Sequence, residues 1–376
     1  MKIGLFEAGL PNSDHDAGSA AIVELCALVQ EMGHGLEYLY TGENPWGRTS
    51  DNIIYSHVPV TDNAAKLRVL QEKNIDVAII SRPGPAAQWL HSCKLANIPV
   101  IYFGHDIHHL RLALGNKFLP ASKQVATRDI NAMRLLEHNI WQQSAAVIYP
   151  SAQECNIVNA YCNKNHALEM PIYDLSAACE KYKNTPVNIK QEAGTKLLFV
   201  GGAHHTPNHD GVMWFASEVL PNLHIDFTLY IVGDWPEIIR TEIIKSWNAN
   251  SKAKQVLEFC GVVPIESLYN MYRSTDIVIA PLRYGAGVKR KVAEALALGR
   301  PLIGTEISFE GININGLEPY ILSETNGTAY ANKIAEMLAG DMDKLLQELA
   351  GFSEVLLAKY SNNYRKKVLE RALGLL

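Results

Sequence analysis

The chain has 376 residues, of which 48% are hydrophobic and 19% charged, and its 34 Lys and Arg against 39 Asp and Glu give a net charge of −5. This length exceeds what one hydrophobic core serves, so two globular domains are expected, and the composition excludes collagen-like, low-complexity and largely disordered chains. The acidic balance argues against nucleic acid as a partner, so a bound anion would need a local cluster of cations.

Six cysteines are scattered without the paired spacing of a disulfide framework or a zinc site, which is typical of a reducing compartment. The N-terminal stretch MKIGLFEAGLPNSDHDAG favours a first strand over a signal peptide. No apolar run approaches the roughly 18 residues that span a bilayer. We therefore expect a cytoplasmic protein and leave open a peripheral contact with the inner face of the membrane.

Short apolar runs alternate with segments of helical period through the first half of the chain, which predicts a parallel sheet covered by helices on both faces. The expected strands are residues 2–6, 36–40, 76–81, 99–103 and 145–149. The expected helices are residues 19–32, 63–73, 85–96 and 128–142. We assign residues 1–170 to this N-terminal domain.

Residues 171–195 lose this periodicity among prolines, turn formers and mixed charge, so they are the expected linker. The alternation then restarts. The expected strands are residues 196–200, 227–232, 256–259, 276–280 and 301–304, and the expected helices are residues 211–220, 236–249, 265–272, 289–298 and 326–339. Residues 341–376 are expected to be helical throughout, and we end the C-terminal domain at residue 350. The fold class is α/β, with two doubly wound, Rossmann-like domains.

The segment most informative about function is residues 281–305, PLRYGAGVKRKVAEALALGRPLIGT, which predicts strand, glycine loop, helix and strand. Gly285 and Gly287 let the backbone approach a ligand closely. The helix that begins near Val288 points its first N–H groups and the positive end of its dipole toward the same place. A phosphate group fits such an arrangement.

Lys289, Arg290 and Lys291 fall in the first turn of that helix, where cations oppose the helix dipole, so a bound anion would explain the cluster. Glu294 follows Lys291 by one turn on the same face and is suited to accept hydrogen bonds from ribose hydroxyls. The alternative to a phosphate site is that the glycines form a tight turn and that the basic residues form a solvated helix face.

These residues resemble the nucleotide-sugar-binding signature of family 4 glycosyltransferases, the retaining enzymes of GT-B fold. Further segments resemble the donor domain of that family: residues 199–215, 229–236 and 259–287. Others resemble the acceptor domain of the subgroup that acts on bacterial surface polysaccharides: residues 13–34, 75–84 and 98–111. The resemblance covers most of residues 1–340.

The resemblance implies transfer of a sugar, with retained anomeric configuration, from a nucleoside diphosphate sugar to a hydroxyl of a glycan or lipid-linked glycan. It implies two domains facing across a cleft, with residues 351–376 crossing back to the first. No cofactor is expected. No metal ion is expected either, because fixed cations and helix N–H groups would stabilise the diphosphate and no Asp-x-Asp pair ends a strand. The sequence leaves the base, the sugar, the acceptor and the oligomeric state undefined.

By the same resemblance, Lys291 matches the lysine that contacts the donor diphosphate, with Lys289 or Arg283 sharing that contact. Glu294 matches the second Glu of the Glu-x7-Glu motif and is expected to contact ribose. The first Glu of that motif falls at Ala286, so its role is unfilled.

Two glycine positions complete the expected donor-binding set. Gly202 stands where relatives often carry a phosphate clamp of Arg and Lys, which this chain lacks. Gly18, in the segment Asp16-Ala17-Gly18-Ser19, matches a glycine-rich loop near the diphosphate and the acceptor. The alternative for that segment is a plain helix start capped by Asp16 or Ser19.

His105 and Asp106 follow the expected strand 99–103 and are the expected catalytic residues. The resemblance places His105 near the donor sugar, and Asp106 could fix the tautomer of His105 or bind the acceptor. An ordinary His-rich surface loop is one alternative. A zinc site that uses two of the histidines His105, His108 and His109 is another alternative, but the sequence offers no clear third ligand for it.

No carboxylate nucleophile stands out, which favours front-face attack, in which the leaving phosphate accepts the proton of the acceptor. A nucleotide-sugar 2-epimerase of the same architecture is the nearest rival, followed by a catalytically silent sugar-nucleotide-binding protein. An NAD-dependent oxidoreductase is disfavoured because no GxGxxG follows the first strand.

Overall fold

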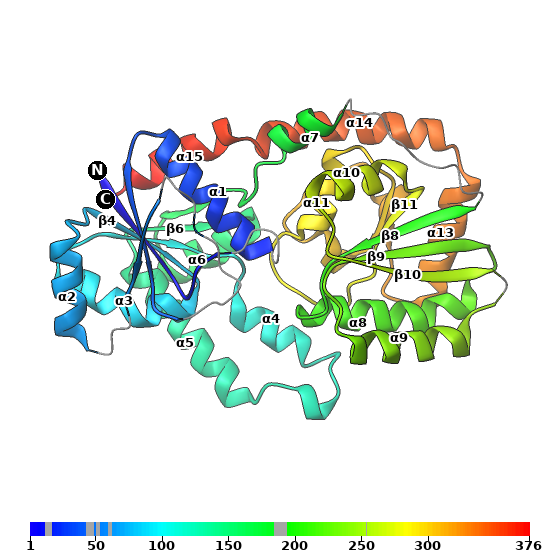
Figure 1. The fold of residues 1–376 in the computed structure, drawn as a ribbon, viewed down its shortest axis with the longest axis horizontal. Helices are drawn as coiled ribbons and strands as arrows, with labels where there is room; N and C mark the ends of the chain where they lie inside the picture. Colours follow the sequence, from blue (N-terminus) through cyan, green and yellow to red (C-terminus); the bar gives the residue numbers. More distant parts are fainter. Residues whose placement is uncertain (12–16, 43–48, 50–52, 59–61, 184–193, 253) are drawn as a thin grey trace. The chain divides into compact units, whose positions relative to one another are not determined.

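The computed structural model describes residues 1–11, 17–42, 49, 53–58, 62–183, 194–252 and 254–376 (Figure 1). The chain divides into two compact units. The first unit comprises Met1–Ala113, Val125–Asp174 and Tyr360–Leu376, and the second comprises Leu114–Gln124 and Leu175–Lys359. The second unit therefore includes a short segment from the first half of the sequence.

The first unit is built on a seven-stranded parallel sheet of order β3-β2-β1-β4-β5-β6-β7. Its strands are β1 (Lys2–Glu7), β2 (Gly35–Tyr40), β3 (Ile54–His57), β4 (Val77–Ser81), β5 (Val100–Phe103), β6 (Ala146–Tyr149) and β7 (Ala167–Glu169). The central strands are buried throughout. A parallel sheet with both faces covered requires such continuous apolar runs.

Helices cover both faces of this sheet: α2, α3 and α5 pack together on one face, and α1 packs against α15 on the other (Figure 1). The helices of this unit are α1 (Ala17–Glu31), α2 (Asn63–Glu72), α3 (Pro83–Leu95), α5 (Thr127–Gln143), α6 (Ala152–Cys162) and α15 (Asn362–Leu373). Helix α4 (His108–Gly115) begins in the first unit and ends in the second.

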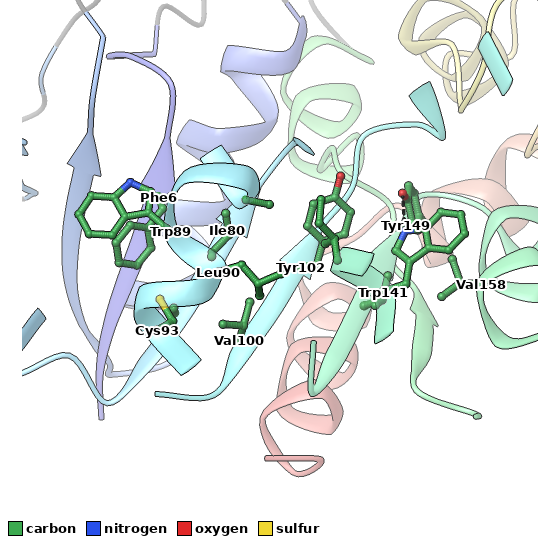
Figure 2. Close-up of a cluster of buried hydrophobic side chains, with 14 of the residues drawn as sticks. Phe6, Ile80, Trp89, Leu90, Cys93, Val100, Tyr102, Trp141, Tyr149 and Val158 are labelled. Carbon is green, nitrogen blue, oxygen red and sulfur yellow. Dashed lines mark hydrogen bonds between the residues drawn. The ribbon is translucent and has the colours of Figure 1, made fainter. Parts of the chain in front are cut away.

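Aromatic side chains fill much of the core between the first sheet and its helices (Figure 2). The ring centroids of Phe6 and Trp89 lie 4.8 Å apart. Trp141 Nε1 donates to the Tyr149 hydroxyl at 3.1 Å, so the polar atom of the indole is satisfied inside the core. Burying each such side chain contributes about 1.5–3 kcal/mol.

The second unit is built on a six-stranded parallel sheet of order β10-β9-β8-β11-β12-β13. Its strands are β8 (Thr195–Val200), β9 (Phe227–Val232), β10 (Gln255–Gly261), β11 (Ile277–Ala280), β12 (Leu302–Thr305) and β13 (Leu322–Ser323). Its helices are α7 (Ser176–Lys183), α8 (Thr206–Trp214), α9 (Glu237–Asn250), α10 (Ile265–Ser274), α11 (Arg290–Ala297), α12 (Glu318–Ile321), α13 (Gly327–Ala339) and α14 (Met342–Lys359). Figure 1 shows α8 and α9 on one face of this sheet and α10 and α11 on the other.

Each sheet contains one place where the order of its strands reverses. In the first unit this switch point lies between β1 and β4, and in the second it lies between β8 and β11. Loops that leave the carboxyl ends of these neighbouring strands run in opposite directions, and ligands of open α/β sheets bind in the crevice that results.

The expected strands are confirmed, with ends that shift by one or two residues. Residues 341–376 are helical almost throughout, as expected, but in two helices, because α14 ends at Lys359 and Ser361 caps α15 by accepting from Tyr364 N at 3.3 Å. The helix expected at residues 211–220 begins earlier, at Thr206, since Pro207 fits a first helical turn.

Other elements carried too little periodicity to be expected. They are the short strands β3, β7 and β13 and the helices α4, α6 and α12, together with α7, which lies inside the residues assigned to the linker. Within the described residues, no helix is both long and apolar enough to cross a membrane. The six cysteines are free thiols.

Candidate functional site

The switch point of the second unit brings together two loops that are far apart in sequence. One loop follows β8 through Gly201 and Gly202 and leads into α8, which carries Asn208. The other follows β11 and leads into α11, whose first turn carries Lys291. Because β8 and β11 are neighbouring strands, both loops lie at the same edge of the sheet.

Gly201 leaves room for the two side chains that meet there. Its φ is +148°, and a Cβ atom at this position would lie 2.6 Å from Asn208 Nδ2 and 2.9 Å from Lys291 Nζ. The Gly201 carbonyl accepts a hydrogen bond from Trp235 Nε1 at 2.8 Å, which fixes the loop. A larger residue at position 201 would therefore displace the Lys291 ammonium group.

Lys291 is buried, with 8% of its surface exposed, and its contacts are mostly uncharged. Its Nζ lies 2.6 Å from Asn208 Oδ1 and 4.0 Å from the centroid of the Phe199 ring. Burial, with a smaller contribution from the charge of Lys289, lowers the pKa of Lys291 to about 7. Over the described part of the chain, no carboxylate forms an ion pair with this ammonium group.

The other two cations of the basic cluster have carboxylate partners within the unit. Lys289 Nζ lies 2.7 Å from Glu310 Oε2 and also donates to the Gly287 carbonyl. Arg290 Nε donates to Glu294 Oε1 at 2.7 Å. A bound anion is therefore not needed to explain Lys289 and Arg290, and the hypothesis of an anion site now concerns Lys291 alone.

Glu294 is only 2% exposed, and both of its carboxylate oxygens accept hydrogen bonds from the protein. Oε1 accepts from Arg290 and Oε2 accepts from the Tyr272 hydroxyl at 3.0 Å. Each carboxylate oxygen retains a second lone pair for a further donor. The contact of Glu294 with ribose stays a prediction.

Arg283 is held by Asp210 through two parallel hydrogen bonds, one of them from Nε at 2.9 Å. Its guanidinium carbon lies 5.6 Å from the centroid of the Phe118 ring, which stacks on Tyr284. Phe118 comes from the segment Leu114–Gln124. The Asp210 carboxylate already occupies the planar fork of Arg283, so the contact of this side chain with phosphate stays a prediction.

The remaining donor-binding candidates of this unit lie along the same edge of the sheet. Gly285 and Gly287 have φ values of +155° and +69°, and Val288 is buried. Gly202 packs so closely that a Cβ atom there would lie 3.2 Å from the Asp234 carbonyl oxygen. The structure thus brings Gly202 and Lys291 to one switch point.

The switch point of the first unit holds a different pair. Glu7, at the end of β1, is 4% exposed, and its Oε2 lies 3.2 Å from Arg82 Nη1, just after β4. Arg82 has φ 69° and ψ 158°, a backbone region that is strained for any residue except glycine. The cation at this edge therefore has a buried carboxylate as its partner.

His105 lies after β5, beside that pair. Its Nε2 is 3.0 Å from Ser81 Oγ, and its ring packs edge-on against Phe103. Burial, and then the positive charge of Arg82, hold the pKa of His105 well below its usual value, so the ring is neutral near pH 7. A neutral imidazole offers one hydrogen-bond donor and one acceptor.

Asp106 has partners other than His105. Its carboxylate lies 2.9 Å from His108 Nδ1 and 2.8 Å from Arg111 Nη1. Burial opposes ionisation, but the hydrogen bond from His108 and the charge of Arg111 lower the pKa of Asp106 to about 2. These contacts replace the expected Asp106–His105 hydrogen bond, because the helical turn at His108 directs both partners toward the carboxylate.

Glu137 organises this histidine segment and was missed in the sequence. It is fully buried, accepts from the backbone N–H groups of His108 and His109 at 2.8 and 3.0 Å, and contacts His109 Nδ1 at 2.7 Å. It therefore caps α4, and its place in the middle of α5 gave no local signal of that role. Asn208, which lies within residues 199–215, one of the segments that resemble the donor domain, was also missed.

Gly18 lies at the second position of α1 and is partly exposed. Asp16 lies outside the described residues, so the cap expected there is not described. Among the residues that the structure describes, no group of three or more His, Cys, Asp or Glu side chains is placed to hold a metal ion.

Residues 194–340 match the family model described as glycosyl transferases group 1. The second unit carries a group 1 glycosyltransferase domain. This glycosyltransferase domain contains both loops of the Lys291 switch point. No curated protein sequence matches the chain.

Solved structures resemble the chain over its whole length. A sucrose-phosphate synthase from Thermosynechococcus elongatus has a TM-score of 0.77 at 14% identity and covers 100% of this chain and 98% of its own. Anabaena HepE, solved with UDP and glucose, has a TM-score of 0.71 at 11% identity with full coverage of both chains. A glycosyltransferase from Rickettsia africae has a TM-score of 0.69 at 17% identity, covering 100% and 98%. Together these likenesses show the GT-B fold, with two Rossmann-like domains.

Proposed function

We propose that this glycosyltransferase transfers a sugar from a nucleoside diphosphate sugar to an acceptor hydroxyl with retained anomeric configuration and without a metal ion. The observation that carries the proposal is Lys291, a buried cation with no carboxylate partner among the described residues, at the switch point of the glycosyltransferase domain. Anabaena HepE, of similar fold, is solved with UDP and with UDP-glucose, which supports a donor of this class.

Sugar transfer from a nucleoside diphosphate is faster when a positive charge lies beside the diphosphate leaving group. As the glycosidic bond breaks, negative charge grows on the diphosphate, so a fixed cation stabilises the transition state more than the ground state. Lys291 supplies that cation, and the first turn of α11, whose N-cap residue has no side-chain cap, supplies N–H groups. Gly18, Gly202, Gly285, Gly287, Val288, Lys289 and Arg283 are proposed to line or support the diphosphate, and Glu294 the ribose.

For the transfer we propose front-face attack. The bond from the anomeric carbon to the diphosphate breaks, the acceptor oxygen bonds to that carbon on the same face, and the acceptor proton passes to the departing phosphate. His105 is proposed to hydrogen-bond a sugar hydroxyl through its neutral ring, and Asp106 to position the histidine segment through His108. The proposed setting is the cytoplasm, at the inner face of the membrane, where a glycan or lipid-linked glycan of a surface polysaccharide would be extended.

The test is a calorimetric titration of the full chain with UDP, GDP, dTDP and their sugars, followed by a transfer assay. We expect one nucleotide series to bind and the release of nucleoside diphosphate to require an acceptor. NMR of the product would report retention. Release or rearrangement of the donor sugar without acceptor would favour a 2-epimerase, and binding without transfer over a broad acceptor panel would favour a silent binding protein.

A further inference from the structure

The partner of Lys291 is an amide where a carboxylate would be expected. Asn208 is 6% exposed and lies in the first turn of α8. Its Nδ2 donates to the Gly202 carbonyl at 2.9 Å, which turns its Oδ1 toward Lys291 Nζ at 2.6 Å. Both ends of the amide are therefore used, and its orientation is fixed by the loop that follows β8.

A buried ammonium group with one neutral acceptor and an aromatic face is only partly stabilised in its charged form. The acids on the surrounding elements have partners of their own. Glu294 on α11 pairs with Arg290, and Glu310 pairs with Lys289. On the face of α8, Asp210 pairs with Arg283.

The remaining groups near Lys291 add no negative charge near neutral pH. Lys289, at the N-cap of the same helix, repels the ammonium group and lowers the pKa of Lys291. The Tyr272 hydroxyl of α10, which donates to Glu294, also lies 3.4 Å from the Lys291 carbonyl oxygen, and burial raises its pKa, so it stays neutral. From β8, Phe199 contributes only its ring face.

We propose that Asn208 is a positioning residue that keeps Lys291 without a fixed counter-charge, so that binding of a nucleoside diphosphate is accompanied by uptake of a proton at Lys291. The inference rests on the proposed function, because it requires the diphosphate to bind beside Lys291. One proton is transferred on binding: neutral Lys291 takes it from the buffer and, as an ammonium group, pairs with an oxygen of the diphosphate. No covalent bond forms or breaks.

The direction of the pH dependence follows from linkage. The bound diphosphate raises the pKa of Lys291 above its value of about 7 in the free protein. The affinity for the nucleoside diphosphate is therefore highest at pH values well below the pKa of Lys291 in the free protein. It falls as the pH rises, by about fivefold between pH 7 and pH 8. At pH 8 roughly nine-tenths of the free protein carries neutral Lys291.

The test is calorimetric titration of the full chain with UDP at pH 8 in two buffers of different ionisation enthalpy, with GDP or dTDP in its place if one of them binds more tightly. The second ionisation of a phosphate lies near pH 6, so the nucleotide itself takes up little proton at pH 8. The slope of the observed enthalpy against the buffer enthalpy gives the proton uptake. We expect close to one proton for the unaltered protein.

Asn208→Asp is the decisive variant, since it keeps the shape of the side chain and supplies the missing carboxylate. Lys291 would then be protonated before the nucleotide arrives, so the uptake should fall toward zero and the affinity should drop at least tenfold. Asn250→Asp, in the same unit on α9, makes the same change of net charge as a control and should keep the full uptake. Lys291→Gln should abolish the uptake even if Asn208→Asp fails to fold.

The outcomes separate the two proposals. If no nucleoside diphosphate binds the unaltered protein, the proposed function fails. If UDP binds with no proton uptake at pH 8, or if Asn208→Asp or Lys291→Gln takes up as much proton as the unaltered protein, the role of Asn208 and Lys291 is wrong while the donor site stands.

Discussion

The two switch points of the molecule share a topology and differ in the partner of their cation. In the first unit, Arg82 pairs with buried Glu7. In the second, Lys291 meets the neutral amide of Asn208. A doubly wound sheet creates the place where a ligand binds, and the groups that line that place decide what binds there.

Because Arg82 has a carboxylate partner and Lys291 has an amide partner, the two edges differ in how strongly they attract an anionic ligand. A buried carboxylate repels a second anion, so the Glu7–Arg82 pair itself favours an anion less than Lys291 does, and Gly18 stays the proposed contact of this unit with the diphosphate. An ammonium group without a carboxylate favours an anion for the same reason. The contrast agrees with the match of residues 194–340 to a glycosyltransferase domain. Four substitutions would break or sharpen it.

Lys291→Gln should have the largest effect. It removes the cation of the second switch point and keeps a hydrogen-bonding end, so we expect UDP affinity to fall on the order of 100-fold, about 2.7 kcal/mol. Calorimetry at pH 6.5, where Lys291 is mostly charged, is the measurement. Lys245→Gln on α9 is the control and should bind UDP normally. If Lys291→Gln binds UDP as tightly as the unaltered protein does, the diphosphate does not bind beside Lys291.

Arg82→Gln tests the other edge. It leaves the Glu7 carboxylate, 4% exposed, without its ion pair, so the free energy of unfolding should fall by about 1–3 kcal/mol and the melting temperature by a few degrees. UDP affinity should not change. The exposed pair of Arg128 and Asp129 offers the control, since Arg128→Gln should alter neither quantity. A tenfold loss of UDP affinity in Arg82→Gln would contradict the contrast between the edges.

His105→Ala should lower turnover about tenfold, the value of one lost hydrogen bond to a sugar hydroxyl, with donor affinity unchanged. Initial-rate kinetics alongside nucleotide titration separates the two effects. His91→Ala, an exposed histidine of the same unit, should behave like the unaltered protein. A normal rate in His105→Ala would take this residue out of the mechanism.

Glu294→Gln should have the smallest effect, a loss of about threefold in UDP affinity. The amide offers one acceptor oxygen where the carboxylate offers two, and Arg290 and Tyr272 compete for it. A titration with uridine and with UDP should show the same loss for both ligands if the contact is to ribose. A loss confined to UDP would mean that Glu294 acts through Arg290 on the diphosphate.

The positions of strands and of the glycine loop could be predicted from the sequence because their signals are local. Apolar runs marked β8 and β11, and the spacing of Gly285 and Gly287 marked the turn into α11. The basic first turn of that helix was visible for the same reason. Most boundaries shifted by a residue or two, and the start of α8 by five, since helix and strand ends depend on contacts outside the element.

The charge pairing could not be predicted, because it depends on residues that the fold brings together. Asn208 lies 83 positions before Lys291, and Asp210 lies 73 positions before Arg283. Phe118 stacks on Tyr284 from a segment of the first half of the chain. Three consecutive basic residues looked alike in sequence. In the fold, Lys289 pairs with Glu310, 21 positions on, and Arg290 pairs with Glu294 one turn further along the same helix, whereas Lys291 pairs with no carboxylate among the described residues.

The most direct test of the central claim is a crystal structure of the full chain with UDP bound. We predict that an oxygen of the diphosphate lies within hydrogen-bond distance of Lys291 Nζ, beside Gly201 and the first turn of α11. UDP bound elsewhere, with Lys291 Nζ contacting only Asn208 and the face of Phe199, would contradict the account.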